Sequence, residues 1–356
     1  MRGPYSPLLG IVGPTGAGKS ALALHLAASF PAEIVSCDAL QVYRGADIGT
    51  GKLSVSERRG ITHHMLDVAD PSQEFSAASY IRLAAPIIKD IDGRGKVPVV
   101  VGGTGLYLRA LLRGLFDGPG RDPQLRNRIE NIALRRGQEF VHRMLHRVDP
   151  ASAGRIHPND LIRTVRALEV SLLAKRPMSD LMEERTSPLA GYRAVLVGLA
   201  PPRGELARRI EDRVRGMFEN GLADEVQRMV SDFGHDAPVA KAIGYRQVAK
   251  YLAGEIGLDE AQRLTVKATL QYAKRQMTWF RREEGVVWFA FSGDDPEGQE
   301  TIEEYLRARE GLTPLGARGP AEHVETIESS ESTEAIEPIG PIRPIGEEGV
   351  HAKTTS

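Results

Sequence analysis

The chain has 356 residues, of which 41% are hydrophobic and 26% charged, and its formal net charge is −1. These proportions are ordinary for a globular protein, and no apolar run approaches the length of a membrane span. Cys37 is the only cysteine, which excludes an intrachain disulfide and a cysteine-based zinc cluster. The N-terminus lacks a signal-peptide pattern, so we expect a cytoplasmic protein with no membrane partner.

The first hundred residues alternate strand and helix patterns. Short apolar runs predict three buried strands, and longer stretches of helical periodicity predict helices between them. Such alternation indicates a parallel sheet covered by helices on both faces. The predicted strands are 8–12, 33–36 and 97–101, and the predicted helices are 21–28, 75–92 and 106–112.

Strand patterns are absent from about residue 115 to residue 191. Helical patterns cover Pro123–Arg136, Gln138–Arg147 and Asp160–Ala174, and Arg and Lys outnumber Asp and Glu across the segment. We therefore predict a helical insertion domain over 115–191 that interrupts an α/β core. The core's first part is then 1–114 and its second part 192–315.

The second part of the core begins with the apolar strand pattern of 193–199. Helical patterns follow, and Val286–Phe289 predicts a last strand. The predicted helices are Pro202–Asn220, Ala223–Asp232, Tyr245–Ala253 and Asp259–Glu284.

Residues 316–356 form a separate acidic tail. From Arg318 to Ser356 the net charge is −5, which leaves +4 for the rest of the chain. The Glu-, Ser-, Pro- and Gly-rich composition cannot bury a core and predicts disorder. The mildly basic remainder permits nucleic-acid binding without requiring it.

A phosphate-binding loop follows the first predicted strand. Its pattern, G-x-x-x-x-G-K-S, lies between a strand and a helix, which is the context that a P-loop requires. Backbone N–H groups and the helix N-terminus would bind a di- or triphosphate, Lys19 would reach its terminal phosphates, and the Ser20 hydroxyl would be a ligand for Mg²⁺. The loop consists of Gly13, Pro14, Thr15, Gly16, Ala17, Gly18, Lys19 and Ser20. These features predict a P-loop NTPase-like α/β fold with a parallel sheet.

Polar residues also follow the other two predicted strands of this part. Asp38 and the loop Gly102–Gly105 come at carboxyl ends, where open α/β sheets bind ligands. Asp38 could be a general base or a Mg²⁺ organiser, but it could equally be a helix cap or turn residue. The glycines could form a tight turn or bring the backbone close to a ligand, with the Thr104 hydroxyl as donor or acceptor.

Two helices carry arginines or lysines beside an apolar side. Arg209 and Arg213 lie four residues apart; such arginines usually form a solvated rim, although one could clamp a diphosphate. Lys267, Lys274 and Arg281 recur at intervals of seven, which suits either a solvated surface or an RNA backbone. For the adjacent His63 and His64 we expect a turn or polar contact instead of a metal site.

Seven sequence blocks, in order, resemble the signature of tRNA dimethylallyltransferases of the bacterial type. The resemblance runs from about Leu8 to Phe289 and leaves only the tail outside. The blocks are Ser36–Thr50, His63–Asp67, Val101–Tyr107, His157–Asp160, Arg166–Glu169, Ile243–Arg246 and Ala273–Arg281.

The resemblance implies transfer of a dimethylallyl group from dimethylallyl diphosphate to the exocyclic amine of the adenosine on the 3′ side of the anticodon in tRNA. It implies Asp38 as general base, with Arg213 and Thr104 as further catalytic residues, and places the P-loop around the donor. It places the tRNA against Asp38, Ala39, Leu40, Gln41, Thr104, Arg126, Ile162, Arg163, Thr164, Val165 and Arg166. We also expect Mg²⁺ as a cofactor and a monomeric protein.

Two positions matter when this chain is set against the family pattern. Position 162, often Gln in relatives, is Ile here and offers no polar contact, and Cys37 fills a variable position and is not expected to be a nucleophile. Three other functions remain open. They are prenylation of free adenine nucleotides, a P-loop kinase reaction, and NTP-gated RNA binding without catalysis.

Overall fold

The computed structural model describes residues 5–310, and the predicted acidic tail lies outside them. The strands are β1 (Ser6–Val12), β2 (Ala32–Ser36), β3 (His63–His64), β4 (Val97–Val101), β5 (Tyr192–Leu199) and β6 (Val286–Phe289). The helices are α1 (Lys19–Ser29), α2 (Ala77–Gly93), α3 (Gly105–Arg113), α4 (Pro123–Arg136), α5 (Gln138–Val148), α6 (Pro150–Arg155), α7 (Leu161–Ala174), α8 (Met178–Glu183), α9 (Arg203–Glu219), α10 (Leu222–Phe233), η1 (Val239–Lys241), α11 (Tyr245–Leu252), α12 (Leu258–Phe280) and α13 (Pro296–Glu310).

The six strands form one all-parallel sheet in the order β3-β2-β4-β1-β5-β6, which confirms the predicted α/β class. The central strand β1 pairs with β4 on one side and β5 on the other, so that Leu9 lies between Val99 and Val195. Because the P-loop follows β1, this order places it at the middle of the sheet's carboxyl edge.

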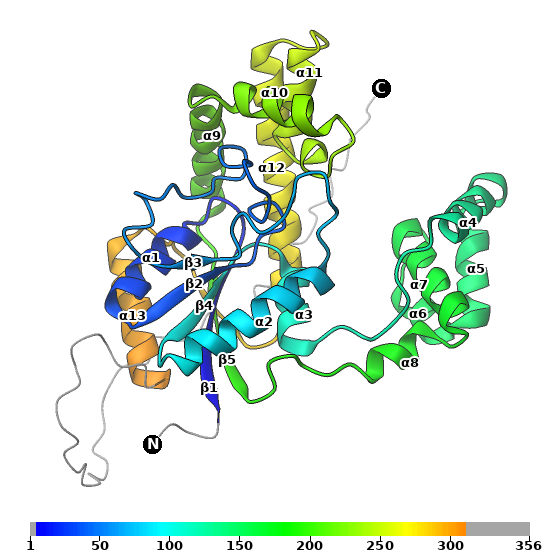
Figure 1. Ribbon diagram of the computed structural model, residues 1–356, viewed down its shortest axis with the longest axis horizontal. Coiled ribbons are helices and arrows are strands. Elements are labelled where there is room, and N and C mark those ends of the chain that lie inside the picture. Colours follow the sequence, from blue (N-terminus) through cyan, green and yellow to red (C-terminus); the bar gives the residue numbers. More distant parts are fainter. Residues whose placement is uncertain (1–4, 311–356) are drawn as a thin grey trace, which may run out of the picture.

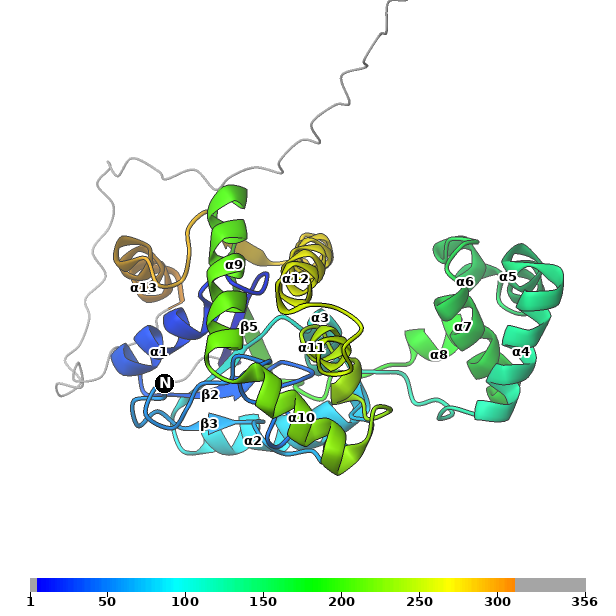
Figure 2. The ribbon, with the colours of Figure 1, turned by 90° about the horizontal axis from the view of Figure 1, so that it is seen from above.

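Helices cover both faces of the sheet, as Figures 1 and 2 show. Leu22 and Leu26 of α1 pack with Ile302 and Leu306 of α13 on one face. Ile88 of α2 and residues of α3 pack on the other face. Both sides of β1 are thereby buried, which explains its continuous apolar run.

Helices α9 to α12 form a further layer above the carboxyl edge of the sheet (Figure 1). Ile210 and Val214 of α9 pack against Ala273 of α12. Helices α10 and α11 pack around Val42 and Tyr43 of the long segment between β2 and β3. This layer brings α9 and α12 over the P-loop.

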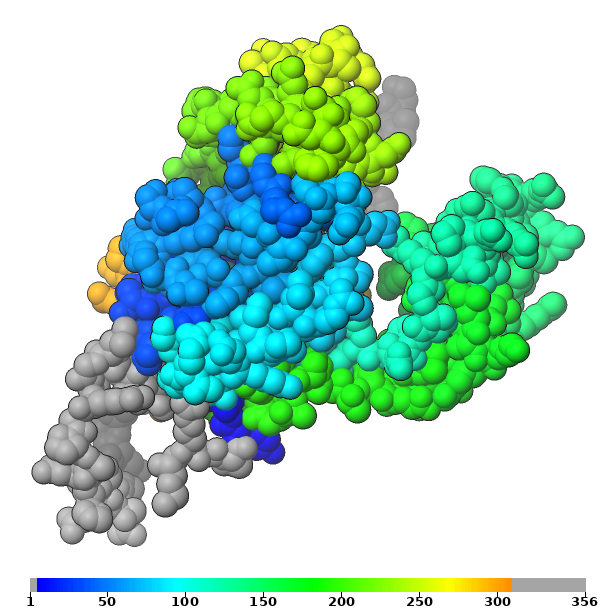
Figure 3. Space-filling model, in the orientation of Figure 1, coloured from blue at the N-terminus to red at the C-terminus, as the bar shows by residue number. Residues whose placement is uncertain are grey.

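Helices α4 to α8 form a lobe that stands away from the sheet and is joined to it by two chain segments (Figures 1 and 2). The lobe has its own apolar cluster, to which Ile129, Val141, Leu145 and Leu168 belong. Figure 3 shows an open hollow between this lobe and the rest of the molecule. The division into domains at 114, 191 and 315 stays a prediction.

The predicted strands and long helices are all present, and the last long helix ends at Phe280 instead of Glu284. The short strand β3, the helices α6, α8 and α13, and the short helix η1 were not predicted. Among residues 5–310, no helix combines the length and the apolar character needed to cross a bilayer.

Candidate active site

The P-loop joins the end of β1 to the first turn of α1. Its backbone bends at Gly13 and Gly18, whose φ angles are +141° and +79°. A Cβ at Gly13 would lie 2.6 Å from the Leu199 carbonyl oxygen, and one at Gly18 would lie 2.6 Å from the Gly293 nitrogen. Only glycine satisfies both the conformation and the space, and the resulting curl presents the positive end of α1 to an anion.

Lys19 is the first residue of α1 and is held at the inner side of the loop. Its Nζ donates a hydrogen bond to the Pro14 carbonyl oxygen at 2.7 Å. Burial lowers the pKa of Lys19 to about 8, the Asp38 carboxylate opposes this shift, and the Arg213 guanidinium adds to it. These mutual effects place one carboxylate and two cations within electrostatic reach of one another.

A cavity of about 260 Å³ lies among these three residues. Its walls come from the P-loop, from the segments after β2 and β4, and from α9 and α12. The residues that line it are Thr15, Gly16, Gly18, Lys19, Ser20, Ala21, Asp38, Gln41, Thr50, Gly51, Leu53, Val101, Gly102, Arg209, Arg213, Tyr272 and Gln276.

Asp38 is both a turn former and a cavity residue, so the two interpretations of its sequence context are compatible. Its Oδ1 accepts hydrogen bonds from the backbone N–H groups of Leu40 at 2.8 Å and Gln41 at 3.3 Å. Within residues 5–310 no hydrogen bond engages Oδ2. One oxygen therefore fixes the carboxylate, and the other is free to accept a proton.

Thr104 joins the segment after β4 to the segment after β2. Its Oγ1 accepts a hydrogen bond from the Ala39 N–H at 3.0 Å, and its own N–H donates to the Cys37 carbonyl oxygen at 3.2 Å. A Cβ at Gly102 would lie 2.0 Å from that same carbonyl oxygen. The glycine is therefore needed for the close approach that positions Thr104 next to the Asp38 turn.

The two arginines of α9 have different environments. Arg213 donates to the Thr50 carbonyl oxygen at 3.1 Å, and the part of the chain that the structure describes holds no carboxylate within ion-pair distance of it. Arg209 donates to the Gly16 carbonyl oxygen at 2.8 Å and forms an ion pair with Asp294 at 2.8 Å. Arg213 thus faces the cavity without a direct ion-pair partner among the described residues, whereas Arg209 contacts the P-loop and Asp294.

Gln276 and Tyr272 of α12 close the cavity from above. Gln276 Oε1 accepts from the Thr15 N–H at 2.8 Å, and its Nε2 donates to the Gly103 carbonyl oxygen at 3.0 Å. Burial raises the pKa of Tyr272 to about 12, and the nearby Asp38 carboxylate adds to the shift. The sequence places both residues on a basic helix with aromatic neighbours, but nothing in that pattern identified them as cavity residues.

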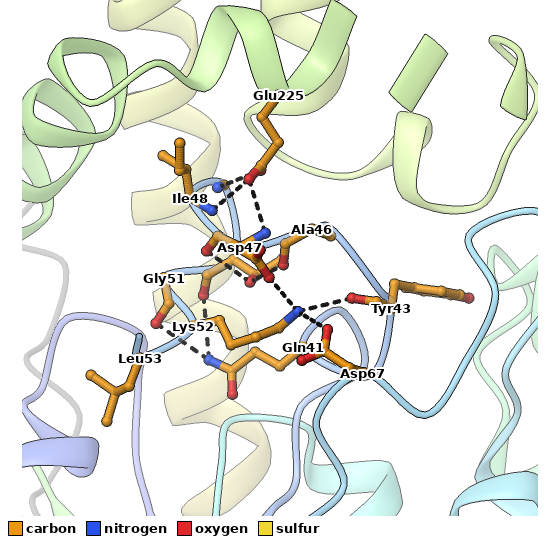
Figure 4. Close-up of polar contacts among 12 residues, drawn as sticks. Gln41, Tyr43, Ala46, Asp47, Ile48, Gly51, Lys52, Leu53, Asp67 and Glu225 are labelled. Atoms are coloured by element: carbon orange, nitrogen blue, oxygen red, sulfur yellow. Dashed lines mark hydrogen bonds and ion pairs between the residues drawn. The ribbon is translucent and has the colours of Figure 1, made fainter. Parts of the chain in front are cut away.

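The loop that carries Thr50 is held by a buried glutamate that sequence analysis missed (Figure 4). Glu225 of α10 is 2% exposed and accepts three backbone N–H groups, those of Asp47 at 2.9 Å, Ile48 at 2.7 Å and Gly49 at 3.0 Å. The Tyr245 hydroxyl donates to Oε1, the oxygen that also accepts the Gly49 N–H, at 2.5 Å. A glutamate in a first helical turn resembles an ordinary exposed residue, so no sequence signal distinguishes it.

Lys52 fixes the other end of this loop, also in Figure 4. Its side chain is 3% exposed, and its Nζ contacts Asp47 and Asp67 carboxylates at 2.6 Å each. The Tyr43 carbonyl oxygen accepts a third hydrogen bond from it at 2.9 Å. The loop is therefore pinned on both sides of Thr50, which fixes the Arg213 contact.

The cavity's polar groups fit a magnesium ion that is bound mainly through a substrate. Ser20 supplies a hydroxyl oxygen in the wall of the cavity. Residues 5–310 contain no cluster of three or more His, Cys, Asp or Glu side chains that could hold a metal by itself. Mg²⁺ commonly binds with one or two protein oxygens, substrate phosphates and water, which matches this set.

The predicted tRNA-binding residues fall into two groups. Asp38, Ala39, Leu40, Gln41 and Thr104 lie together at or beside the cavity. The others lie on the lobe: Arg126, Ile162, Arg163, Thr164, Val165 and Arg166.

Within the lobe the surface exposure of these residues differs. Ile162 is 80% exposed, and Arg163 is exposed and paired with Asp160. Thr164 and Val165 are only 0% and 2% exposed, and Val165 belongs to the lobe's apolar cluster. For these two, a contact between side chain and RNA has to be withdrawn.

Arg126 and Arg166 are engaged inside the lobe by a second buried glutamate. Both contact Glu169, which is 0% exposed, at 3.2 Å and 2.8 Å. Arg166 also donates to the Pro119 carbonyl oxygen at 3.0 Å, and Glu169 accepts the Asp122 N–H at 2.7 Å. Their observed contacts therefore stabilise the lobe and the segment that leads into it.

His63 and His64 form β3, and His64 Nε2 contacts Glu33 at 2.7 Å, so a polar contact is confirmed. Lys267 and Lys274 are exposed on α12, and Arg281 is exposed directly after its end, so all three are compatible with either predicted role.

Comparison with known proteins identifies relatives over most of the chain. A family model described as IPP transferase matches residues 41–283. A tRNA dimethylallyltransferase of Solibacter usitatus is 48% identical over 296 residues, which cover 83% of this chain and 96% of the relative. One of Geobacter metallireducens is 48% identical over 285 residues, 80% of this chain and 92% of the relative.

Solved structures agree with the sequence relatives. The tRNA isopentenylpyrophosphate transferase of Bacillus halodurans is 37% identical, with a TM-score of 0.63 over 84% of this chain and 95% of its own. A eukaryotic dimethylallyltransferase acting on tRNA is 26% identical, with a TM-score of 0.72 over 88% of this chain and 81% of its own.

Proposed function

The chain belongs to the IPP transferase family, and on that premise we propose that it transfers a dimethylallyl group from dimethylallyl diphosphate to tRNA. The acceptor is the exocyclic amine of the adenosine on the 3′ side of the anticodon, and diphosphate is the second product. The observation that carries the proposal is the arrangement of Asp38, Lys19 and Arg213 around one cavity at the sheet's carboxyl edge.

The acceptor amine needs a base, because its lone pair is delocalised into the adenine ring. As the new N–C bond forms, the amine proton passes to Asp38 Oδ2, and the bond between the allylic carbon and the diphosphate oxygen breaks. The Leu40 and Gln41 N–H groups hold Oδ1 and so orient Oδ2. A positioned base of this kind contributes about 10²–10⁴ to the rate.

The leaving diphosphate gains negative charge, and the P-loop side of the cavity opposes it. Lys19, the loop N–H groups and the N-terminus of α1 bind the phosphates on one side, and Arg213 approaches from α9. Since Thr50 holds Arg213 in place, this charge stabilisation is arranged before the reaction begins.

We further propose Mg²⁺ as the metal, held by Ser20 and the bound diphosphate. When bound there, the ion neutralises phosphate charge.

The target base must leave the anticodon-loop stack to reach Asp38, and the hollow beside the lobe offers space for the stem (Figure 3). We propose Arg126, Ile162, Arg163 and Arg166 as lobe contacts to the tRNA, and a protein that acts as a monomer in the cytoplasm.

The test compares acceptors with one donor. Radiolabelled dimethylallyl diphosphate is incubated with the protein and with either unmodified tRNA or AMP, and ATP hydrolysis is followed in parallel. Label in tRNA alone supports the proposal; label in AMP supports nucleotide prenylation, and tRNA-stimulated phosphate release from ATP supports an NTPase. Asp38→Asn should lower single-turnover rates about 10²–10⁴-fold with little change in tRNA affinity, and a rate within tenfold of wild type would remove Asp38 from the role of base.

A further inference from the structure

Gln276 reaches from α12 into the space between two loops that serve different substrates. Its side chain is buried, with 5% of the residue exposed. Its carbonyl oxygen accepts from the Thr15 N–H at 2.8 Å, and its amide nitrogen donates to the Gly103 carbonyl oxygen at 3.0 Å. Both ends of one planar amide are therefore used, each on a different loop.

The two loops are those of the donor and the acceptor. Thr15 belongs to the P-loop, which binds the diphosphate under the proposed function. Gly103 precedes Thr104, whose hydroxyl accepts the Ala39 N–H beside the catalytic carboxylate. One planar amide group is hydrogen-bonded to both loops, so a shift of either loop would displace the Gln276 side chain.

The surrounding chain is shaped to admit this bridge. A Cβ at Gly103 would lie only 2.0 Å from Gln276 Nε2, so a larger residue there would push the side chain out. Without Gln276, the Thr15 N–H and the Gly103 carbonyl oxygen would each lose this hydrogen-bond partner. The bridge is consequently a defined connection between the loops, with a glycine opposite the glutamine.

We propose that Gln276 is a positioning residue that couples the donor and acceptor sites. Diphosphate on the P-loop fixes Thr15; through the Gln276 amide this orders Gly103 and Thr104 and improves binding of the tRNA. Thermodynamic linkage requires the reverse effect to be equal, so bound tRNA tightens diphosphate by the same factor. This inference rests on the proposed function, since it assigns the two loops to those two ligands.

The test measures the dissociation constant of unmodified tRNA with and without saturating inorganic diphosphate, a pair of ligands that cannot react. For the wild type we expect diphosphate to tighten tRNA binding at least about fivefold, the lower end of typical coupling between sites. Gln276→Met keeps the size of the side chain but removes both hydrogen bonds, and the factor should fall below about twofold. Gln262→Met, on the same helix but away from the cavity, is the matched control and should keep the wild-type factor.

Two more variants separate coupling from general loss of structure. Gln276→Glu can still accept from Thr15 but places a carboxylate oxygen against the Gly103 carbonyl, so it should lose the coupling as well. Gly103→Ala displaces the Gln276 side chain from the other end of the bridge. If Gln276→Met does not fold, Gly103→Ala serves as the test variant in its place. If Gln276 had a purely structural role, its replacement would weaken the binding of tRNA and of diphosphate but leave the factor by which diphosphate tightens tRNA binding unchanged.

The outcomes distinguish this inference from the proposed function. A wild-type protein that prenylates tRNA but shows no coupling, or a folded bridge variant that keeps the full factor, overturns the role of Gln276. Absence of prenylation by the wild type overturns the proposed function instead, whatever the coupling measurement gives.

Discussion

Replacing Glu225 with glutamine should destabilise the protein and weaken donor binding together. The wild-type Oε2 accepts the Asp47 and Ile48 N–H groups, and Oε1 accepts those of Gly49 and the Tyr245 hydroxyl. A glutamine amide would direct its own N–H groups at two of these buried donors. In the other orientation Tyr245 can accept, and one donor, Gly49, loses its partner.

The variant takes the less costly orientation, in which one N–H is left without an acceptor at about 1–3 kcal/mol. Glu225→Gln should therefore lower the free energy of unfolding by roughly 1–3 kcal/mol. The loosened loop also presents Thr50 less firmly to Arg213. If about 1 kcal/mol of loop ordering must be recovered on binding, the KM for dimethylallyl diphosphate should rise about fivefold.

Urea denaturation and steady-state kinetics measure the two effects on one preparation. Glu219→Gln provides the control, since this glutamate is exposed and shows no ion pair within residues 5–310. A Glu225→Gln protein that unfolds within about 0.5 kcal/mol of the control would refute the role assigned to the buried carboxylate.

Three further predictions follow from other groups. Because burial lowers the pKa of Lys19 to about 8, the residue loses its charge above that pH, and the wild type should bind inorganic diphosphate progressively more weakly there. The Lys19→Met variant should bind diphosphate weakly at every pH and show no such decrease. Equal pH profiles for the two proteins would count against the role of Lys19. Hydrogen bonds from Arg94 hold the pKa of Glu33 well below its usual value of 4.5, so the stability that Glu33 contributes is present above pH 4.5 and is lost as the pH falls. The difference in unfolding free energy between the wild type and Glu33→Gln should therefore shrink on acidification. A difference that stays constant would contradict this prediction. Gly102→Ala should reduce turnover far more than Gly216→Ala, where a Cβ meets only a side chain at 3.9 Å, and similar activities would argue against the close approach to Cys37.

The sheet and the P-loop could be predicted because their signals are local. Strands buried on both faces appear as apolar runs, and the P-loop needs its glycines and Lys19 at fixed spacing. The short strand β3 lacks such a signal, since His63 and His64 are held by pairing with β2 and by Glu33. Helix α13 depends likewise on α1, whose His25 contacts Glu303 at 2.9 Å.

Buried acidic residues explain most of what could not be predicted. Glu225 and Glu169 are both on helices whose sequence suggests exposed charge, yet each is 2% exposed or less and binds segments distant in sequence. Arg126 and Arg166 have the composition of an RNA-binding surface, but that composition does not indicate that both contact Glu169. Pattern alone identifies a charge and does not identify its partner.

The position of β1 at the centre of the sheet has a consequence for folding during synthesis. β1 is the first strand to be made, but its neighbours are β4, which ends at Val101, and β5, which ends at Leu199. At roughly 5–20 residues per second, the ribosome needs on the order of 10–40 s after β1 to complete β5. Throughout that interval the edge of β1 that later pairs with β5 has no partner. The nascent chain therefore exposes an apolar strand that chaperones can bind and that can aggregate, well before the active site assembles.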